Sequence, residues 1–141
     1  MLIQDTRAIV SGGASGLGLA VAELVVAAGG KVALFDVNDE AGVDAVRKLG
    51  PAASFHKVDV TVESAVAAAV AAATTAMGGL NLAVSCAGVG WPKRMVGKEG
   101  TMPGDFFRKV IEINLVGTLL LCKDAAAAMQ QYSPTAAGER G

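Results

Sequence analysis

Short apolar runs alternate along the chain with segments in which apolar residues recur at helical spacing. Three runs, at residues 7–11, 31–35 and 80–85, are largely apolar and predict strands, and residues 53–58 are expected to form a further strand. Between them, residues 17–28, 39–49 and 61–77 predict helices, and a longer helix is expected over 104–131. Strands without a polar face, separated by helices, are typical of a parallel sheet covered on both sides. The pattern therefore predicts an α/β fold with a doubly wound parallel sheet.

Turn and capping residues mark the ends of these expected elements. Gly29-Gly30 ends the first helix, Gly50-Pro51 ends the second, and Thr61 is expected to cap the third. Residues 89–103 are expected to form a loop insertion, and residues 133–141 a C-terminal loop. The length of 141 residues fits a single domain over residues 1–141.

Composition and charge exclude several classes of function. The net charge is −1, so no basic surface is expected for nucleic acid or for an anionic membrane. Residues 64–92 carry no charge, but they are rich in alanine and are broken by glycines and Asn81, which favours a buried helix and strand over a membrane span. The two cysteines form no CxxC pair and no metal-site spacing, which indicates a reducing compartment, either cytoplasmic or organellar, and of these the cytoplasm is expected.

A glycine-rich turn joins the first expected strand to the first expected helix, with the sequence Ser11-Gly-Gly-Ala-Ser-Gly-Leu-Gly18. The spacing Gly-x-x-x-Gly-x-Gly lets the backbone turn sharply and approach a diphosphate. The helix start adds free N–H groups and the positive end of its dipole. Ordinary tight connections also use glycines, but the position between strand and helix favours a dinucleotide phosphate site.

Asp36 ends the second expected strand, roughly 20 residues after the glycine-rich turn. A carboxylate there can accept hydrogen bonds from both ribose hydroxyls of an adenosine, and its charge repels a 2′-phosphate. No Arg or Lys lies in the turn or directly after Asp36. We therefore expect NAD to be favoured over NADP by roughly tenfold to a hundredfold or more. Taken alone, Asp36 could instead be a turn residue that caps the helix at Asp39.

Further candidates follow the third and fourth expected strands. Asp59-Val60 and Cys86-Ala87-Gly88 lie where ligands bind in open α/β sheets, outside the carboxyl ends of the strands. Taken singly, the first pair is better read as a helix entry and the second group as a small-residue turn. Asn114 and Gly117 are both poor mid-helix residues, and together they predict a local distortion of the long helix near a site. A tolerated polar residue is the alternative for Asn114.

Together these motifs resemble the short-chain dehydrogenase/reductase family. The resemblance covers the whole chain in order, although Ser11 stands where the family usually has Thr and Ser85-Cys86 where it usually has two Asn. Within the family the sequence is similar to the type 2 3-hydroxyacyl-CoA dehydrogenases, through the Cys-Ala-Gly turn, the loop at 89–102 and Gly-Asp-Phe-Phe-Arg before Asn114. The resemblance implies a truncated Rossmann-type fold with a strand order of 3-2-1-4, in which the fourth strand is an apolar open edge. An isolated chain with such an edge is expected to be sticky, poorly stable or paired.

The resemblance also implies a cofactor, a reaction and partners. The cofactor is NAD, the reaction is oxidation of 3-hydroxyacyl-CoA by hydride transfer, the small-molecule substrate is an acyl-CoA, and the complete protein is a homo-oligomer. Asn114 is the implied catalytic residue. The cofactor-binding residues implied are Ser11, Gly12, Ser15, Gly16, Leu17, Gly18, Asp36, Val37, Asp59, Val60, Cys86, Ala87 and Gly88. Lys93, Arg94 and Lys98 could contact CoA phosphates, but a solvated loop explains these three charges better.

The family's Ser and Tyr-x-x-x-Lys have no counterpart in the 141 residues. The only tyrosine is Tyr132, and the fourth residue after it is Ala136. The chain is therefore expected to be the NAD-binding half of a dehydrogenase and to be inactive alone. The alternatives are a non-catalytic NAD-binding or interaction module, or a family member that acts on another secondary alcohol such as a steroid, a sugar or a 3-oxoacyl carrier.

Overall fold

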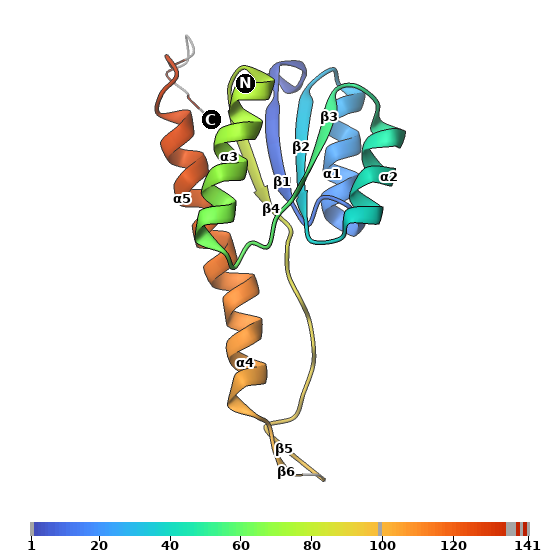
Figure 1. The fold of residues 1–141 in the computed structure, drawn as a ribbon, viewed down its shortest axis with the longest axis vertical. Coiled ribbons are helices and arrows are strands. Elements are labelled where there is room, and N and C mark those ends of the chain that lie inside the picture. Colours follow the sequence, from blue (N-terminus) through green and yellow to red (C-terminus); the bar gives the residue numbers. More distant parts are fainter. Residues whose placement is uncertain (1, 99, 135–137, 139, 141) are drawn as a thin grey trace.

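A computed structural model of the chain describes residues 2–98, 100–134, 138 and 140. The described chain forms one four-stranded sheet with helices on both faces (Figure 1). Its strands are β1 (Arg7–Ser11), β2 (Lys31–Asp36), β3 (Ala53–Lys57) and β4 (Leu82–Ser85). The helices between them are α1 (Gly16–Ala27), α2 (Asp39–Leu49) and α3 (Glu63–Met77), and a short 3-10 turn, η1 (Ile3–Asp5), precedes β1.

The four strands pair in parallel in the order β3-β2-β1-β4, which confirms the expected topology. Alternate residues of β1 and β2 face two separate apolar layers. Ala8 and Val10 pack under α1 and α2, whereas Ile9 packs under α3 and the last helix, α5 (Gly117–Met129). Both faces of these central strands are buried, which is why the residues in the middle of each strand are all apolar.

The edge strand β4 is less well covered than the strands beside it. Leu82, Ala83 and Val84 are only half-buried, whereas Ala8 to Ser11 of the neighbouring β1 are fully buried. The expected apolar open edge is therefore present. Whether this edge makes the isolated chain sticky or poorly stable stays a prediction.

The segment after β4 differs from the expectation in its hairpin and in where its last helix ends, and its helix is divided where a distortion was expected. Residues 89–103, expected as a loop, contain a two-strand antiparallel hairpin of β5 (Val96–Gly97) and β6 (Gly100–Thr101). The expected long helix is divided into α4 (Gly104–Ile111), a π-helical turn η2 (Glu112–Val116) and α5, which ends at Met129. Figure 1 shows that α4 and the hairpin project beyond the sheet. Of the expected C-terminal loop, residues 135–137, 139 and 141 lie outside the described part of the chain.

The expected cap of α3 is also wrong. Val62 occupies the N-cap position and makes no side-chain capping bond. The Thr61 hydroxyl and the Thr61 N–H both donate to Asp59 Oδ1 instead, at 2.7 and 2.9 Å. The side chain that satisfies this turn is therefore an aspartate two residues earlier, and Thr61 is its partner.

Candidate functional site

The glycine-rich turn is held in place by close backbone contacts. Gly12 and Gly16 have φ angles of +63° and +53°, which favour glycine. A Cβ on Gly18 would lie 2.2 Å from the carbonyl oxygen of Gly12, so α1 can approach the turn only because position 18 has no side chain. Ser15, the N-cap of α1, makes no side-chain capping bond. The backbone N–H groups in the first turn of α1 are therefore available to another hydrogen-bond acceptor.

Asp36, at the end of β2, is fixed beside this turn. Its Oδ2 accepts the N–H of Ala14 and its Oδ1 accepts the N–H of Asn38, both at 3.1 Å. The α2 helix is capped by Asn38, whose side chain accepts the N–H of Ala41, so Asp36 is not the cap. A carboxylate has about four lone-pair positions, and two remain for a ligand.

Ser11 and Ser85 hold the turn that follows β4. The Ser11 hydroxyl accepts the N–H of Ala87 at 3.3 Å and donates to the Ser85 hydroxyl at 3.5 Å. Ser11 itself is fully buried. On the other side, a Cβ on Gly12 would meet the backbone of Cys86 and Ala87 at 2.8 Å. The glycine turn and the Cys-Ala-Gly turn are thus packed backbone against backbone.

Asn114 binds the chain directly after the Cys-Ala-Gly turn. Its Oδ1 accepts the N–H of Val89 at 2.8 Å and its Nδ2 donates to the carbonyl oxygen of Val89 at 2.9 Å. Asn114 lies within the π-helical turn η2, which confirms the local distortion expected from Asn114 and Gly117. Gly117 lies so close to Val60 that a Cβ would meet the valine Cγ2 at 2.6 Å.

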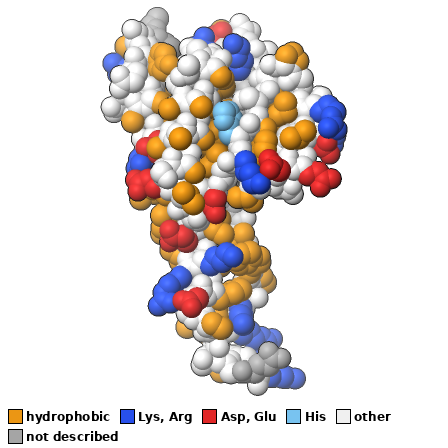
Figure 2. Space-filling model, viewed as in Figure 1, with side chains coloured by type: hydrophobic (Ala, Val, Ile, Leu, Met, Phe, Trp, Pro, Cys, Tyr) orange, Lys and Arg blue, Asp and Glu red, His pale blue; other side chains and the backbone are white. Residues whose placement is uncertain are grey.

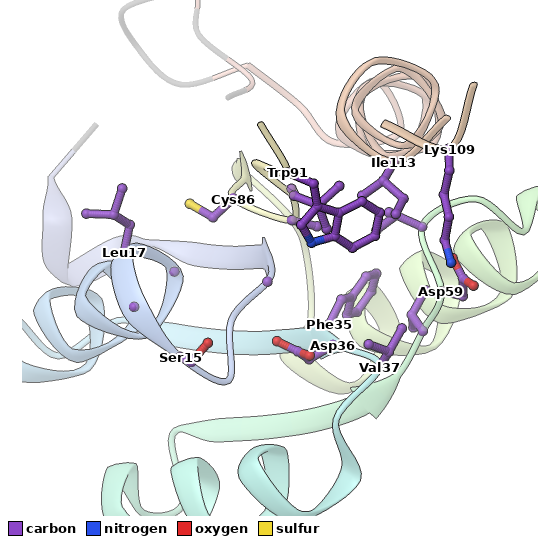
Figure 3. A pocket seen from close by; sticks show the side chains of 18 residues that line it. Ser15, Leu17, Phe35, Asp36, Val37, Asp59, Cys86, Trp91, Lys109 and Ile113 are labelled. Carbon is purple, nitrogen blue, oxygen red and sulfur yellow. The ribbon is translucent and has the colours of Figure 1, made fainter. Parts of the chain in front are cut away.

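These segments enclose one cavity of about 560 Å³, a volume typical of small-molecule sites (Figure 3). It is lined by Gly12, Ser15, Gly16, Leu17, Gly18, Asp36, Val37, Asp59, Val60, Cys86, Ala87 and Gly88, and also by Phe35, Val58, Val89, Trp91, Lys109 and Ile113. The first group contains every expected cofactor-binding residue except Ser11. Neither Ser11 nor the expected catalytic Asn114 lines the cavity. Each forms a hydrogen bond with the backbone of a residue that does line it, Ala87 and Val89 respectively.

The residues of the second group were not predicted from the sequence. Phe35, Val58 and Val89 are chain neighbours of expected residues, so their positions could have been proposed. Lys109 and Ile113 share a helical spacing of four residues with each other, which offers a weak signal. Trp91 offered none, because only the path of the loop after Gly88 brings its indole to the cavity.

The remaining chemistry of the described chain lies elsewhere. Burial lowers the pKa of His56, which packs edge-on against Phe35 with ring centroids 5.5 Å apart and does not line the cavity. In the described residues, no three His, Cys, Asp or Glu side chains gather where a metal could bind. No helix among them is sufficiently long and apolar to cross a membrane.

Three comparisons with known proteins agree with this geometry. The family model for short chain dehydrogenases matches residues 6–138. The chain is 38% identical over 141 residues to 3-hydroxyacyl-CoA dehydrogenase type-2 of Homo sapiens and 37% identical to that of Bos taurus, in each case over 99% of this chain and 54% of the relative. The crystal structure of 3-hydroxyacyl-CoA dehydrogenase type-2 from Mycobacterium avium superposes with a TM-score of 0.90 at 36% identity, over 99% of this chain and 55% of that one. The chain spans about half the length of these proteins.

Proposed function

This chain belongs to the short-chain dehydrogenase family, and from that membership we propose that its cavity binds NAD for an oxidoreductase reaction at a secondary alcohol. One observation carries the proposal. Segments at the ends of four strands, each predicted to bind a part of a dinucleotide, line a single cavity. The motifs were weak one by one, and their convergence on one space is what makes a dinucleotide the best fit.

The fit of NAD to these residues follows from the donors and acceptors they offer. The first turn of α1, left without a side-chain cap, faces the cavity through Gly16, Leu17 and Gly18 and suits the negatively charged diphosphate. Among the described residues, nothing beyond the chain neighbours of Gly16 and the nearby α1 backbone lies within 4 Å of the position that a Gly16 Cβ would take, so the backbone there is open to a ligand. Asp36 keeps acceptor capacity for the hydroxyls of a ribose, and Asp59 can accept from an adenine amino group.

The carboxylate of Asp36 also supports a preference for NAD. It lies at the end of β2 with both oxygens already held by backbone N–H groups, so it cannot swing away from a 2′-phosphate without losing those bonds. Lys109 is the single basic side chain among the described lining residues, and it comes from α4. We therefore keep the proposal that NADP binds more weakly than NAD.

For the complete protein we propose 3-hydroxyacyl-CoA as the substrate, supported by the names of the similar proteins. Bound NAD would supply a hydride acceptor at its nicotinamide ring. Within the described chain, Asn114 fixes the backbone at Val89 beside the Cys-Ala-Gly turn and so orients that wall of the cavity. The 141 residues contain no Tyr-x-x-x-Lys to move the substrate proton, so we expect them to bind NAD without turnover.

Partners other than the cofactor stay predictions. Lys93, Arg94 and Lys98, considered for CoA phosphates, are all exposed, and basic side chains gather at the end of the projection formed by α4 and the hairpin (Figure 2). Exposed apolar side chains repeat every four residues along α4, η2 and α5, at Phe107, Ile111, Leu115 and Leu119. We propose this row of apolar side chains as a contact surface of the expected homo-oligomer.

Calorimetric titration of the 141-residue chain with NAD and with NADP tests the proposed function. We expect NAD to bind more tightly than NADP. Asp36→Asn removes the charge but keeps the shape of the side chain. It should weaken the binding of NAD and reduce the difference in affinity between NAD and NADP. Asp44→Asn is the matched control, because Asp44 of α2 pairs with Arg47 outside the cavity and its side chain is 49% exposed. Absence of NAD binding, or tighter binding of NADP by the unmodified chain, contradicts the proposal.

A further inference from the structure

A stack of aromatic and cationic side chains joins the segment after β4 to α4. The rings of Trp91 and Phe106 lie 6.0 Å apart between centroids, at a tilt of 45°. The Lys109 Nζ lies 5.6 Å from the centroid of Trp91, and the Lys93 Nζ lies 5.4 Å from that of Phe106. Each ring therefore has an ammonium group within the range of a cation–π interaction.

This stack reaches into the cavity at one end. Trp91 and Lys109 both line the cavity, whereas Phe106 and Lys93 do not. Figure 3 shows the indole of Trp91 across the cavity from Phe35, Asp36 and Val37, with Asp59 and Lys109 to one side. The indole is 43% exposed and Val37 is 60% exposed, although both are large apolar side chains. Two apolar surfaces thus face each other across a space that the described protein atoms leave open.

The position of the indole is fixed from two directions. Asn114 holds the backbone at Val89, two residues before Trp91, through two hydrogen bonds. Lys109 and Phe106 hold the ring itself from α4. A tryptophan that only filled a gap in the core would be buried, and Trp91 is not. An aromatic ring held rigidly with an exposed face suits a planar ligand.

We propose that Trp91 is a stacking surface for the adenine ring of the dinucleotide, with Lys109 as the residue that positions the indole. The inference rests on the proposed function, because it concerns the same cavity. Adenine is the planar group proposed to lie between Trp91 and Val37. Asp36 is proposed to bind the adjoining ribose, and Asp59 lies to one side of the same space, where an adenine amino group can donate to it. Val37 provides the opposite face. This places the adenine between a valine and a tryptophan.

The test compares NAD with ADP-ribose, which carries the adenosine half without nicotinamide, by titration calorimetry on the 141-residue chain. Stacking on an aromatic ring is lost in Trp91→Leu, so the affinities for NAD and for ADP-ribose should both fall by the same factor, about 5- to 150-fold. Trp91→Phe keeps an aromatic face and should weaken them far less. Lys109→Met, which loses only the cation over the indole, should weaken both by about two- to fivefold.

Tyr132→Leu is the matched control, because it replaces another exposed aromatic residue by leucine outside the cavity. If Trp91→Leu binds NAD as tightly as this control does, the stacking assignment is wrong while the proposed function stands. If Trp91→Leu weakens NAD but not ADP-ribose, the indole serves the nicotinamide half and the adenine assignment is overturned. If the unmodified chain binds neither compound, the proposed function fails and the stacking assignment fails with it.

A second measurement needs no substitution. Trp91 is the only tryptophan in the chain, so its fluorescence reports on this position alone. We expect ADP-ribose to quench or shift the emission of the unmodified chain with the same Kd that calorimetry gives. Calorimetric binding of ADP-ribose without any change in the emission contradicts the assignment.

Discussion

Replacement of Asn114 by alanine tests how the wall of the cavity beyond β4 is held. The side chain makes two hydrogen bonds to Val89, one to its N–H at 2.8 Å and one from Asn114 to its carbonyl oxygen at 2.9 Å. In Asn114→Ala both bonds are lost at once. The segment between Gly88 and Trp91 then has no side chain from η2 to hold it.

The size of the effect follows from two contributions, the lost hydrogen bonds and the higher helix propensity of alanine. A hydrogen bond in a folded protein contributes about 0.5–1.5 kcal/mol net, and water can reach this exposed residue, so the two bonds together contribute about 1–2 kcal/mol. Alanine is favoured over asparagine in a helix by up to about 0.7 kcal/mol, which offsets part of the loss. The expected net loss of unfolding free energy is about 0.5–1.5 kcal/mol, or a fall in Tm of about 2–6 °C.

Thermal unfolding followed by circular dichroism measures this loss, and hydrogen exchange at the Val89 amide locates it. Glu112→Ala is the control, since Glu112 is an exposed residue of the same π-helical turn. Asn114→Asp keeps the acceptor but sets a carboxylate oxygen against the Val89 carbonyl, so it should be at least as destabilising as the loss of one bond. An unchanged Tm together with unchanged exchange at Val89 in Asn114→Ala would refute the reasoning.

Two further predictions concern a glycine and the single histidine. Gly18→Ala should distort the glycine turn and cost about 1–3 kcal/mol, because its Cβ would meet the Gly12 carbonyl oxygen at 2.2 Å. Chemical denaturation measures this loss, and Gly90→Ala, whose Cβ meets nothing within 4 Å, should stay close to the unmodified chain. Burial lowers the pKa of His56, so as the pH falls below about 6.5 the unfolded chain takes up a proton first and the unfolding free energy falls. His56→Gln should remove that dependence, and because His56 is the only histidine, a single imidazole NMR signal that titrates above 6.5 would contradict the assignment.

The apolar pattern was sufficient for the core of the fold. The strands at 7–11 and 31–36 were recognisable because both of their faces are buried, so apolar residues occupy consecutive positions in their middle. The half-buried strand at 53–57 mixes apolar and polar residues. The distortion at η2 was also predictable, since Asn114 and Gly117 each weaken an α-helix locally. In both cases the signal is carried by residues close together in the sequence.

The differences between expectation and structure have separate physical causes. Thr61 was expected to cap α3, but its hydroxyl donates a hydrogen bond to the carboxylate of Asp59, because the turn before the helix brings these two side chains together. The hairpin of β5 and β6 is only two residues long on each side, too short to show an alternating pattern. Ser11, expected to bind the cofactor, is fully buried and accepts the N–H of Ala87, so any direct contact with the cofactor stays a prediction.

The sequence by itself determined the α/β alternation and the segments that line the cavity from the ends of β1 to β4, because glycine spacing, strand-end carboxylates and apolar runs are local properties. The tertiary structure alone decided what closes the cavity on the remaining side. Trp91 and Lys109 lie 18 residues apart, in a loop and in a helix that projects beyond the sheet, and no local pattern relates them. The contact between Trp91 and Lys109 depends on the hydrogen bonds between Asn114 and Val89 and on the packing of Trp91 against Phe106 of α4.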